Sequence, residues 1–163
     1  MGTHALHTPG RSAGHGEPTA PWRLSASATL HCLTGCAIGE VAGLAIGTAL
    51  GWGNLATIAL AVGLAFVFGY LLTSMPLLRS GLTLGAVVPI ALAADTVSIA
   101  VMEAVDNAMM LAIPGAMNAG LGNFLFWGSL AIALGIAFLA ALPVNRWLIA
   151  RGKGHAVAHG AHR

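Results

Sequence analysis

Glycine recurs at every fourth position of one apolar stretch of this chain. The five glycines are Gly35, Gly39, Gly43, Gly47 and Gly51. Because a helix turns by about 100° per residue, a spacing of four places them in one row along a helix. A row of glycines lets a second helix backbone approach closely, which is typical of helix contacts inside membranes. The sequence therefore predicts a helix-packing surface along this row.

A second row, of chemically reactive side chains, runs beside the glycines at the same spacing. It contains Cys32, Cys36 and Glu40, and Glu40 is the only charged residue between Ala28 and Gly51. A carboxylate near the middle of a membrane helix costs roughly 2.5–3.5 kcal/mol on insertion scales, so such a residue indicates a function. We expect the two thiols and the carboxylate to lie in the helix contact that the glycines make.

The composition places the whole chain in a membrane. Of its 163 residues, 57% are hydrophobic and only 7% are charged, whereas soluble domains contain about 25% charged residues. The net charge is +2, and no basic run is interleaved with aromatic residues, so a nucleic-acid partner is not expected. We predict a multi-pass protein of the cell inner (plasma) membrane, with the lipid bilayer as its partner.

Four segments are apolar and long enough to cross a bilayer core, which takes about 20 helical residues. They are 28–50, 54–73, 82–103 and 124–142, and an end at 149 is the alternative for the last segment. We predict an all-α bundle of four transmembrane helices within a domain of residues 24–150. Residues 1–23 are expected to form a disordered, His-containing arm, and 151–163 a short His-rich tail. The link 106–122 is compatible with a loop, a surface helix or a re-entrant segment.

The positive charges predict the orientation. All Lys and Arg residues precede the first segment, follow the fourth or lie between the second and third; they are Arg11, Arg23, Arg79, Arg146, Arg151, Lys153 and Arg163. With four spans, all seven lie on one side, which the positive-inside rule makes cytoplasmic. Both termini are therefore expected inside the cell.

The third segment carries its own polar side chains. Asp95 lies near the middle of this span, and Met102 and Asp106 share its helix face. Glu103 lies about 80° to one side, and we expect Glu103 and Asp106 to reach the outer interface. Pro89 predicts a kink, because proline removes a backbone hydrogen bond. No Lys or Arg lies within any span, so these acids must be neutralised by protons, metal ions, hydroxyls or water.

Together these side chains predict a metal site. We expect the glycine face of the first segment to pack against the third, so that Cys32, Cys36 and Glu40 face Asp95. The candidate ligands are His31, Cys32, Cys36, Glu40, Asp95, Met102 and Glu103. Sulfur ligands favour copper or zinc, so we expect binding or transport of a soft or borderline metal cation rather than catalysis. The plainer interpretation is that the cysteines pack as small apolar residues and the acids bond across helices as neutral carboxyls.

Three other functions remain compatible with the sequence. The Cys32 and Cys36 thiols could serve a membrane oxidoreductase, although their spacing differs from the usual redox motif Cys-x-x-Cys. The polar residues could form a proton pathway. They could also serve helix association in a structural or assembly subunit. A homo-oligomer is expected to provide a solute pathway more easily than one small bundle.

Three stretches resemble a bacterial membrane family known as domain of unknown function 4396. They are 31–40 (HCLTGCAIGE), 95–99 (DTVSI, with Glu103 following) and 143–148 (PVNRWL). The resemblance covers about residues 29–153. It implies a small multi-helix membrane protein with no established activity, and it points to His31, Cys32, Cys36, Glu40, Asp95 and Glu103 without assigning them a role.

Overall fold

The computed structural model describes residues 22–151, which form four long helices and one short 3₁₀ helix. In chain order these are α1 (Trp22–Ala49), α2 (Asn54–Arg79), α3 (Leu84–Ala112), η1 (Ala116–Asn118) and α4 (Phe124–Ala150). Each long helix is long and apolar enough to cross a membrane. The predicted all-α, four-span architecture is thereby confirmed. The expected N-terminal arm and His-rich tail lie almost wholly outside the described residues.

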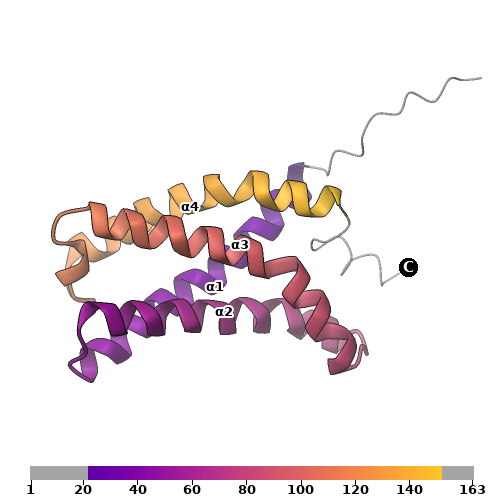
Figure 1. The fold of residues 1–163 in the computed structure, drawn as a ribbon, viewed down its shortest axis with the longest axis horizontal. Helices are drawn as coiled ribbons and strands as arrows, with labels where there is room; N and C mark the ends of the chain where they lie inside the picture. The colour runs from indigo at the N-terminus through magenta and orange to yellow at the C-terminus, as the bar shows by residue number, and fades with distance from the viewer. Residues whose placement is uncertain (1–21, 152–163) are drawn as a thin grey trace, which may run out of the picture.

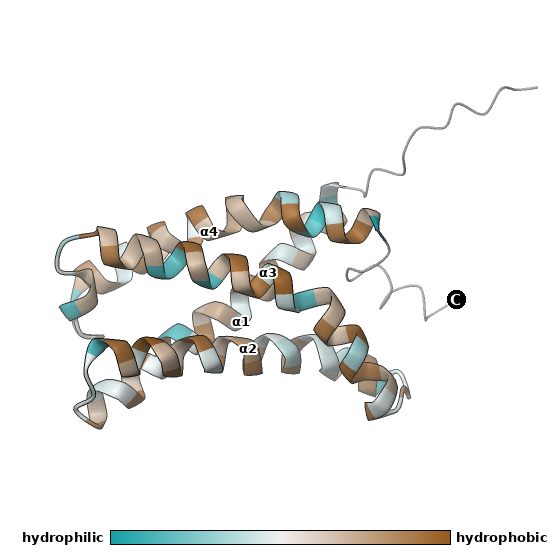
Figure 2. Cartoon of the chain, in the orientation of Figure 1, coloured by the Kyte–Doolittle hydropathy of each residue, from teal (hydrophilic) through white to brown (hydrophobic). Residues whose placement is uncertain are grey.

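The helices α1 and α3 each contact all three other long helices. Figure 1 shows α2 and α4 along opposite edges, with α1 crossing obliquely behind α3. The hydrophilic residues in Figure 2 lie mainly near the helix ends and along α3. The arrangement places any polar residue on the inner faces of α1 and α3 away from lipid.

The helices are longer than the sequence predicted, most clearly α2. The second predicted segment ends at 73, but α2 continues through Pro76 to Arg79. Proline lacks the N–H that would bond the carbonyl four residues earlier, which here belongs to Leu72. The His31 side chain of α1 hydrogen-bonds the backbone of Leu72. This contact satisfies the carbonyl that Pro76 leaves unbonded, so the helix can continue.

The segment that the sequence left open, 106–122, is also largely ordered helix. The helix α3 continues to Ala112, and Met117 follows on η1. The side chain of Asn123 then accepts a hydrogen bond of 2.9 Å from the backbone N–H of Leu125, which caps the start of α4. At the other end of α3, Pro89 lies inside the helix, and Figure 1 shows the N-terminal part of α3 bent away from the remainder.

The glycine row of α1 packs against α2 and not, as predicted, against α3. We call this contact the glycine seam. It pairs Gly35 with Gly69, Gly39 with Ala65, Gly43 with Ala61, and Gly47 with Thr57. Both partners step by four residues in opposite directions, so the two helices run antiparallel with small residues facing each other along four turns.

The glycine seam leaves no room for side chains on α1. A Cβ added to Gly35 would lie 2.7 Å from the Cα of Gly69, and one added to Gly43 would lie 2.5 Å from the Cα of Ala61. Gly51 was predicted to belong to this row, but it does not. Its φ of +68° and open surroundings show that it forms the turn after α1. Glycine is favoured there because other residues rarely adopt positive φ.

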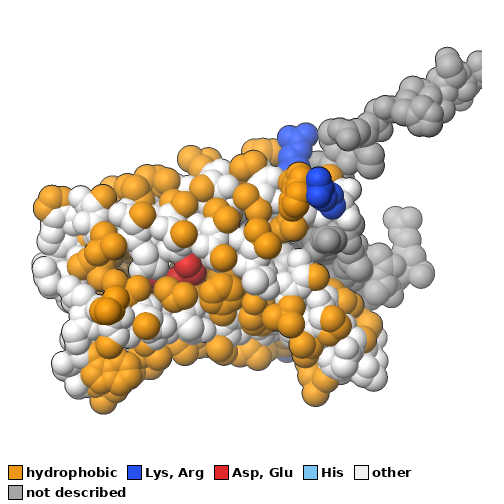
Figure 3. Space-filling model, viewed as in Figure 1, with side chains coloured by type: hydrophobic (Ala, Val, Ile, Leu, Met, Phe, Trp, Pro, Cys, Tyr) orange, Lys and Arg blue, Asp and Glu red, His pale blue; other side chains and the backbone are white. Residues whose placement is uncertain are grey.

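The positive charges of the described chain all lie at one end of the bundle. Arg23 begins α1, Arg79 ends α2, and Arg146 and Arg151 lie in and just after the last turns of α4. On the face shown in Figure 3, Lys and Arg atoms appear only at this end, next to the chain termini. We call it the basic end and the opposite end, which carries η1, the η1 end. The segregation agrees with the predicted orientation, in which the basic end is cytoplasmic.

Candidate functional site

The row containing Cys32 faces α3. Rows that begin three residues apart on a helix are rotated by about 60° from each other, so α1 can present glycine to α2 and polar side chains to α3. We call this second contact the polar seam. It consists of Cys32, Cys36 and Glu40 from α1 and Asp95, Ser98, Glu103 and Asp106 from α3.

The polar seam begins, on the side of the basic end, with a thiol and a carboxyl. The Sγ atom of Cys32 lies 3.6 Å from Oδ1 of Asp95, and the thiol donates this hydrogen bond. Ser98 also approaches Cys32, and Thr73 of α2 approaches Asp95. Cys32, Asp95 and Ser98 are each at most 1% exposed. This level of the seam is a closed polar cluster shared by three helices.

The next two turns bring three carboxyls together. The thiol of Cys36 faces Glu103, and Glu40 faces Asp106 and also interacts electrostatically with Glu103. Glu103 is 4% exposed and Asp106 only 1%. Cys36 and Glu40 approach these two carboxyls, but none of the four carboxyl oxygens of Glu103 and Asp106 has a partner in hydrogen-bond geometry. Burying such groups unpaired is unfavourable, so each must hold a proton or share a cation.

No basic side chain is available to neutralise these acids within the described chain. Its four arginines are all at the basic end, and it contains no lysine. Of the five Asp and Glu residues in the whole sequence, four line the polar seam. The protein therefore concentrates almost all of its negative side chains in one buried contact.

The register between α1 and α3 differs from the prediction. Asp95 lies opposite Cys32, and the partner of Glu40 is Asp106. Cys32 and Glu40 are separated by eight residues, or about 12 Å along the helix, so the expected Glu40–Asp95 pair is wrong. Asp106 was assigned to the outer interface because the third span was expected to end at 103. Its helix face, shared with Asp95 and Met102, was the signal that could have included it.

The remaining two candidate ligands lie in different places. Met102 is fully buried and packs in the same core cluster as Cys32 and Cys36, so its thioether belongs to the polar seam. His31 lies on another face of α1, where it lines a hollow beside α2 with Met75 and Arg79. Within residues 22–151, no group of three or more His, Cys, Asp and Glu side chains is arranged to hold a metal ion. The seam presents its ligands as pairs on successive turns.

Buried polar groups continue from the seam toward the basic end. Asn145 of α4 donates a hydrogen bond of 2.9 Å from Nδ2 to Oγ1 of Thr29, which in turn donates to the carbonyl of Ser25 at 2.8 Å. Ser25 and Thr29 are fully buried. From Ser25 to Glu40, α1 thus has a polar side chain inside the bundle at every turn. Fifteen residues span about 22 Å, most of a bilayer core of about 30 Å.

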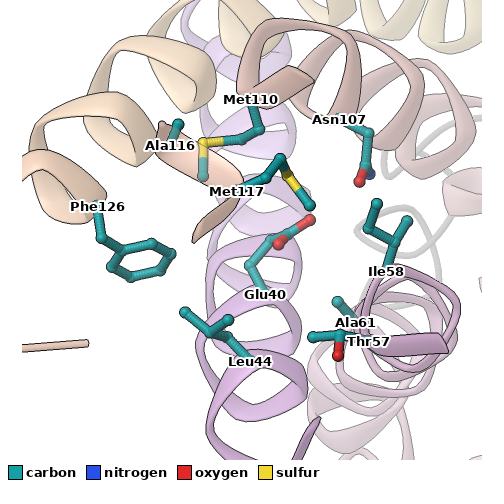
Figure 4. A pocket seen from close by; sticks show the side chains of 10 residues that line it. All are labelled: Glu40, Leu44, Thr57, Ile58, Ala61, Asn107, Met110, Ala116, Met117 and Phe126. Atoms are coloured by element: carbon teal, nitrogen blue, oxygen red, sulfur yellow. The ribbon is translucent and has the colours of Figure 1, made fainter. Parts of the chain in front are cut away.

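At the η1 end the seam adjoins a small cavity. Its volume is about 30 Å³. It is lined by Glu40, Leu44, Thr57, Ile58, Ala61, Asn107, Met110, Ala116, Met117 and Phe126. Figure 4 shows the carboxyl of Glu40 pointing into this space beside the side chains of Met110 and Met117. Acidic atoms also show through the apolar face of the bundle in Figure 3. The polar seam therefore approaches the surface at its η1 side.

Comparison with known proteins gives one match. A family model described as "Domain of unknown function (DUF4396)" matches residues 21–154, which include all four long helices and the whole polar seam. No curated protein and no solved structure matches the chain.

Proposed function

Because the chain belongs to the DUF4396 family, whose description assigns no activity, we propose from the polar seam that this multi-pass membrane protein binds a cation and passes it across the bilayer. The observation that supports this most is the pair Glu103 and Asp106. These two buried carboxyls face a third on Glu40, and only thiol and carboxyl groups approach them, with no basic partner. A cation is the group that would satisfy them best. We place the protein in the inner (plasma) membrane.

The donor set favours a soft or borderline metal, such as copper or zinc, as the transported ion. Cys32 and Cys36 supply two thiols, Met102 supplies a thioether beside them, and carboxyls face each thiol from α3. Thiolate, thioether and carboxylate together are typical ligands of these metals. In this proposal the ion is substrate and is passed between ligand pairs along α1 and α3.

A proton pathway is the second candidate, and the pairing itself favours it. Titratable groups face each other at Cys32–Asp95, Cys36–Glu103 and Glu40–Asp106. Pairs on successive turns are enough for proton transfer, whereas a metal would need a third or fourth ligand from a side-chain rearrangement. Chains of Asp and Glu are a recurring device of membrane proton relays.

An oxidoreductase using the two thiols has less support. Cys32 and Cys36 are each 1% exposed, and each thiol faces a carboxyl rather than the other thiol. Thiol exchange requires access for the attacking thiolate. The purely structural role is an outcome of the experiment below.

Metal binding is tested by elemental analysis of the purified full chain after equilibration with Cu(I) or Zn(II) and desalting. The six tail histidines, at 4, 7, 15, 155, 159 and 162, are replaced by alanine in every sample to remove chelation outside the bundle. We expect one bound ion fewer in Cys32→Ser/Cys36→Ser and in Glu103→Gln/Asp106→Asn than in the parent. Equal metal content in all three proteins contradicts the metal proposal.

The pH dependence separates the two cations. Metal ligands must lose their protons to bind, so metal content should fall as pH is lowered, and uptake should release protons. A proton pathway instead acidifies proteoliposomes under a membrane potential with no metal present. If the protein shows neither metal content nor proton flux, the polar seam is structural.

A further inference from the structure

The cavity at the η1 end has a ligand chemistry of its own. It lies between the outer parts of α1, α2 and α3 and the start of α4, and η1 covers one side. Two of its lining residues are methionines, Met110 from α3 and Met117 from η1, and the one acidic side chain is Glu40. Met117 falls outside every predicted span, which is why the sequence did not associate it with Glu40.

We propose that this cavity is a binding site for a monovalent soft metal cation, Cu(I) or the chemically similar Ag(I). The inference rests on the proposed function for its ion class, and it adds a site, its ligands and its oxidation state. The ligands are the thioethers of Met110 and Met117 and the carboxylate of Glu40.

The ligand types select this ion. Thioethers are soft and uncharged, so they favour Cu(I), whereas zinc takes thiolate, imidazole and carboxylate. A single carboxylate balances the single positive charge of the ion. The amide of Asn107 also lines the cavity and supplies a further oxygen. Methionine needs no deprotonation, so this site should bind at lower pH than the thiols of the polar seam.

The size and position of the cavity fit a point of entry. A volume of about 30 Å³ open to a water-sized sphere exceeds the roughly 10–15 Å³ that one water molecule needs, which is enough for one desolvated ion. Oε1 of Glu40 is buried and makes no hydrogen bond. Glu40 lines the cavity and also faces Asp106 of the polar seam. An ion held here is therefore bound by the last α1 residue of the polar seam, next to Asp106.

The test is NMR of the full chain in detergent with ¹³C-methyl methionine, titrated with Ag(I) as a redox-inert probe. The chain has six methionines, and the variants Met110→Leu and Met117→Leu assign their signals. In every sample the six tail histidines are replaced by alanine, and Cys32 and Cys36 by serine, so that they do not take up the Ag(I). Met109→Leu is the matched control, since Met109 neighbours Met110 on α3 but does not line the cavity.

One equivalent of Ag(I) should shift the Met110 and Met117 signals together and leave Met109 unshifted, while Zn(II) at the same concentration shifts none of them. Glu40→Gln should weaken Ag(I) binding by about tenfold, a loss of about 1.4 kcal/mol. The proposal is overturned if Ag(I) leaves Met110 and Met117 unshifted, or shifts them no more than Met109.

The outcome is independent of the broader proposal. If Ag(I) shifts Met110 and Met117 but the protein transports no cation, the binding site is supported and the transport function is contradicted. If transport depends on Glu103 and Asp106 but Ag(I) shifts no methionine signal, the pathway is supported and this binding site is contradicted.

Discussion

The helix α1 makes two contacts of opposite character only about 60° apart around its axis. In the glycine seam, Gly35, Gly39, Gly43 and Gly47 meet small residues of α2, and an added methyl group would collide with backbone at three of these positions and with Thr57 at the fourth. In the polar seam, thiols and carboxyls meet across α3, and carboxyl oxygens remain without hydrogen bonds. One contact is closely packed and chemically inert, while the other is incompletely satisfied and chemically reactive.

This difference indicates that the glycine seam stabilises the bundle, whereas the polar seam is the contact to which we assign the function. In a bilayer, helices associate through close packing of small residues, because lipid is as apolar as the side chains. The glycine seam supplies that packing. Buried carboxyls without partners do not stabilise a membrane protein, so their presence in the polar seam is better explained by an ion or proton that they bind.

The largest expected effect comes from filling the glycine seam. Gly43→Leu should destabilise the bundle by about 3 kcal/mol or more, because overpacking here pushes one backbone from another. Gly63→Leu on α2 is the control, since a side chain there meets nothing within 4 Å. Thermal unfolding in detergent micelles measures both. A Gly43→Leu protein as stable as Gly63→Leu would mean that the glycine seam does not hold α1 and α2 together.

The two rows of α1 could be predicted from the sequence, but the helices that each row contacts could not. The four spans, the four-residue glycine row and the intramembrane acids follow from hydropathy and helical period. The period does not say which helix lies on which side, so the glycine row was assigned to α3 instead of α2. A rotation of about 60° is enough to change the partner when three helices surround one.

The register and the outer site depend on structure that hydropathy does not report. The acid opposite Glu40 is set by the axial offset between α1 and α3, and an expected span end at 103 removed Asp106 from consideration. Helix α2 continues through Pro76 because a side chain of α1 satisfies Leu72, which is a tertiary contact. Met117 reaches Glu40 only because η1 folds over the end of the bundle.

A smaller effect is expected where a buried polar contact is satisfied. Thr29→Val removes the oxygen that accepts from Asn145 and should cost about 1–3 kcal/mol, because a buried amide then lacks its partner. Thr34→Val is the matched control: it lies on the same helix, is exposed, and bonds only the carbonyl of Leu30. Thermal unfolding should show a lower stability for Thr29→Val than for Thr34→Val. Equal stability of both variants would show that the Thr29–Asn145 bond contributes nothing.

The smallest effect, and the one of opposite sign, is expected in the polar seam. Asp106→Asn keeps the shape of the side chain and removes the chance of an unpaired buried charge, so stability should stay unchanged or rise by about 1 kcal/mol. Chemical unfolding at neutral pH measures it. A loss of more than about 1 kcal/mol would indicate that Asp106 stabilises the fold, and the contrast between the two seams would then disappear.

The central claim is that the polar seam carries a cation, and uptake into proteoliposomes tests it most directly. Cu(I), Zn(II) and proton uptake are measured for the parent chain and for Glu103→Gln/Asp106→Asn. Glu17→Gln, which changes the one acid outside the seam, is the control. We predict uptake of at least one of these cations by the parent and the control, and a loss of about tenfold or more in the double variant at unchanged thermal stability. Equal uptake by all three proteins, or none by the folded parent, would contradict the account.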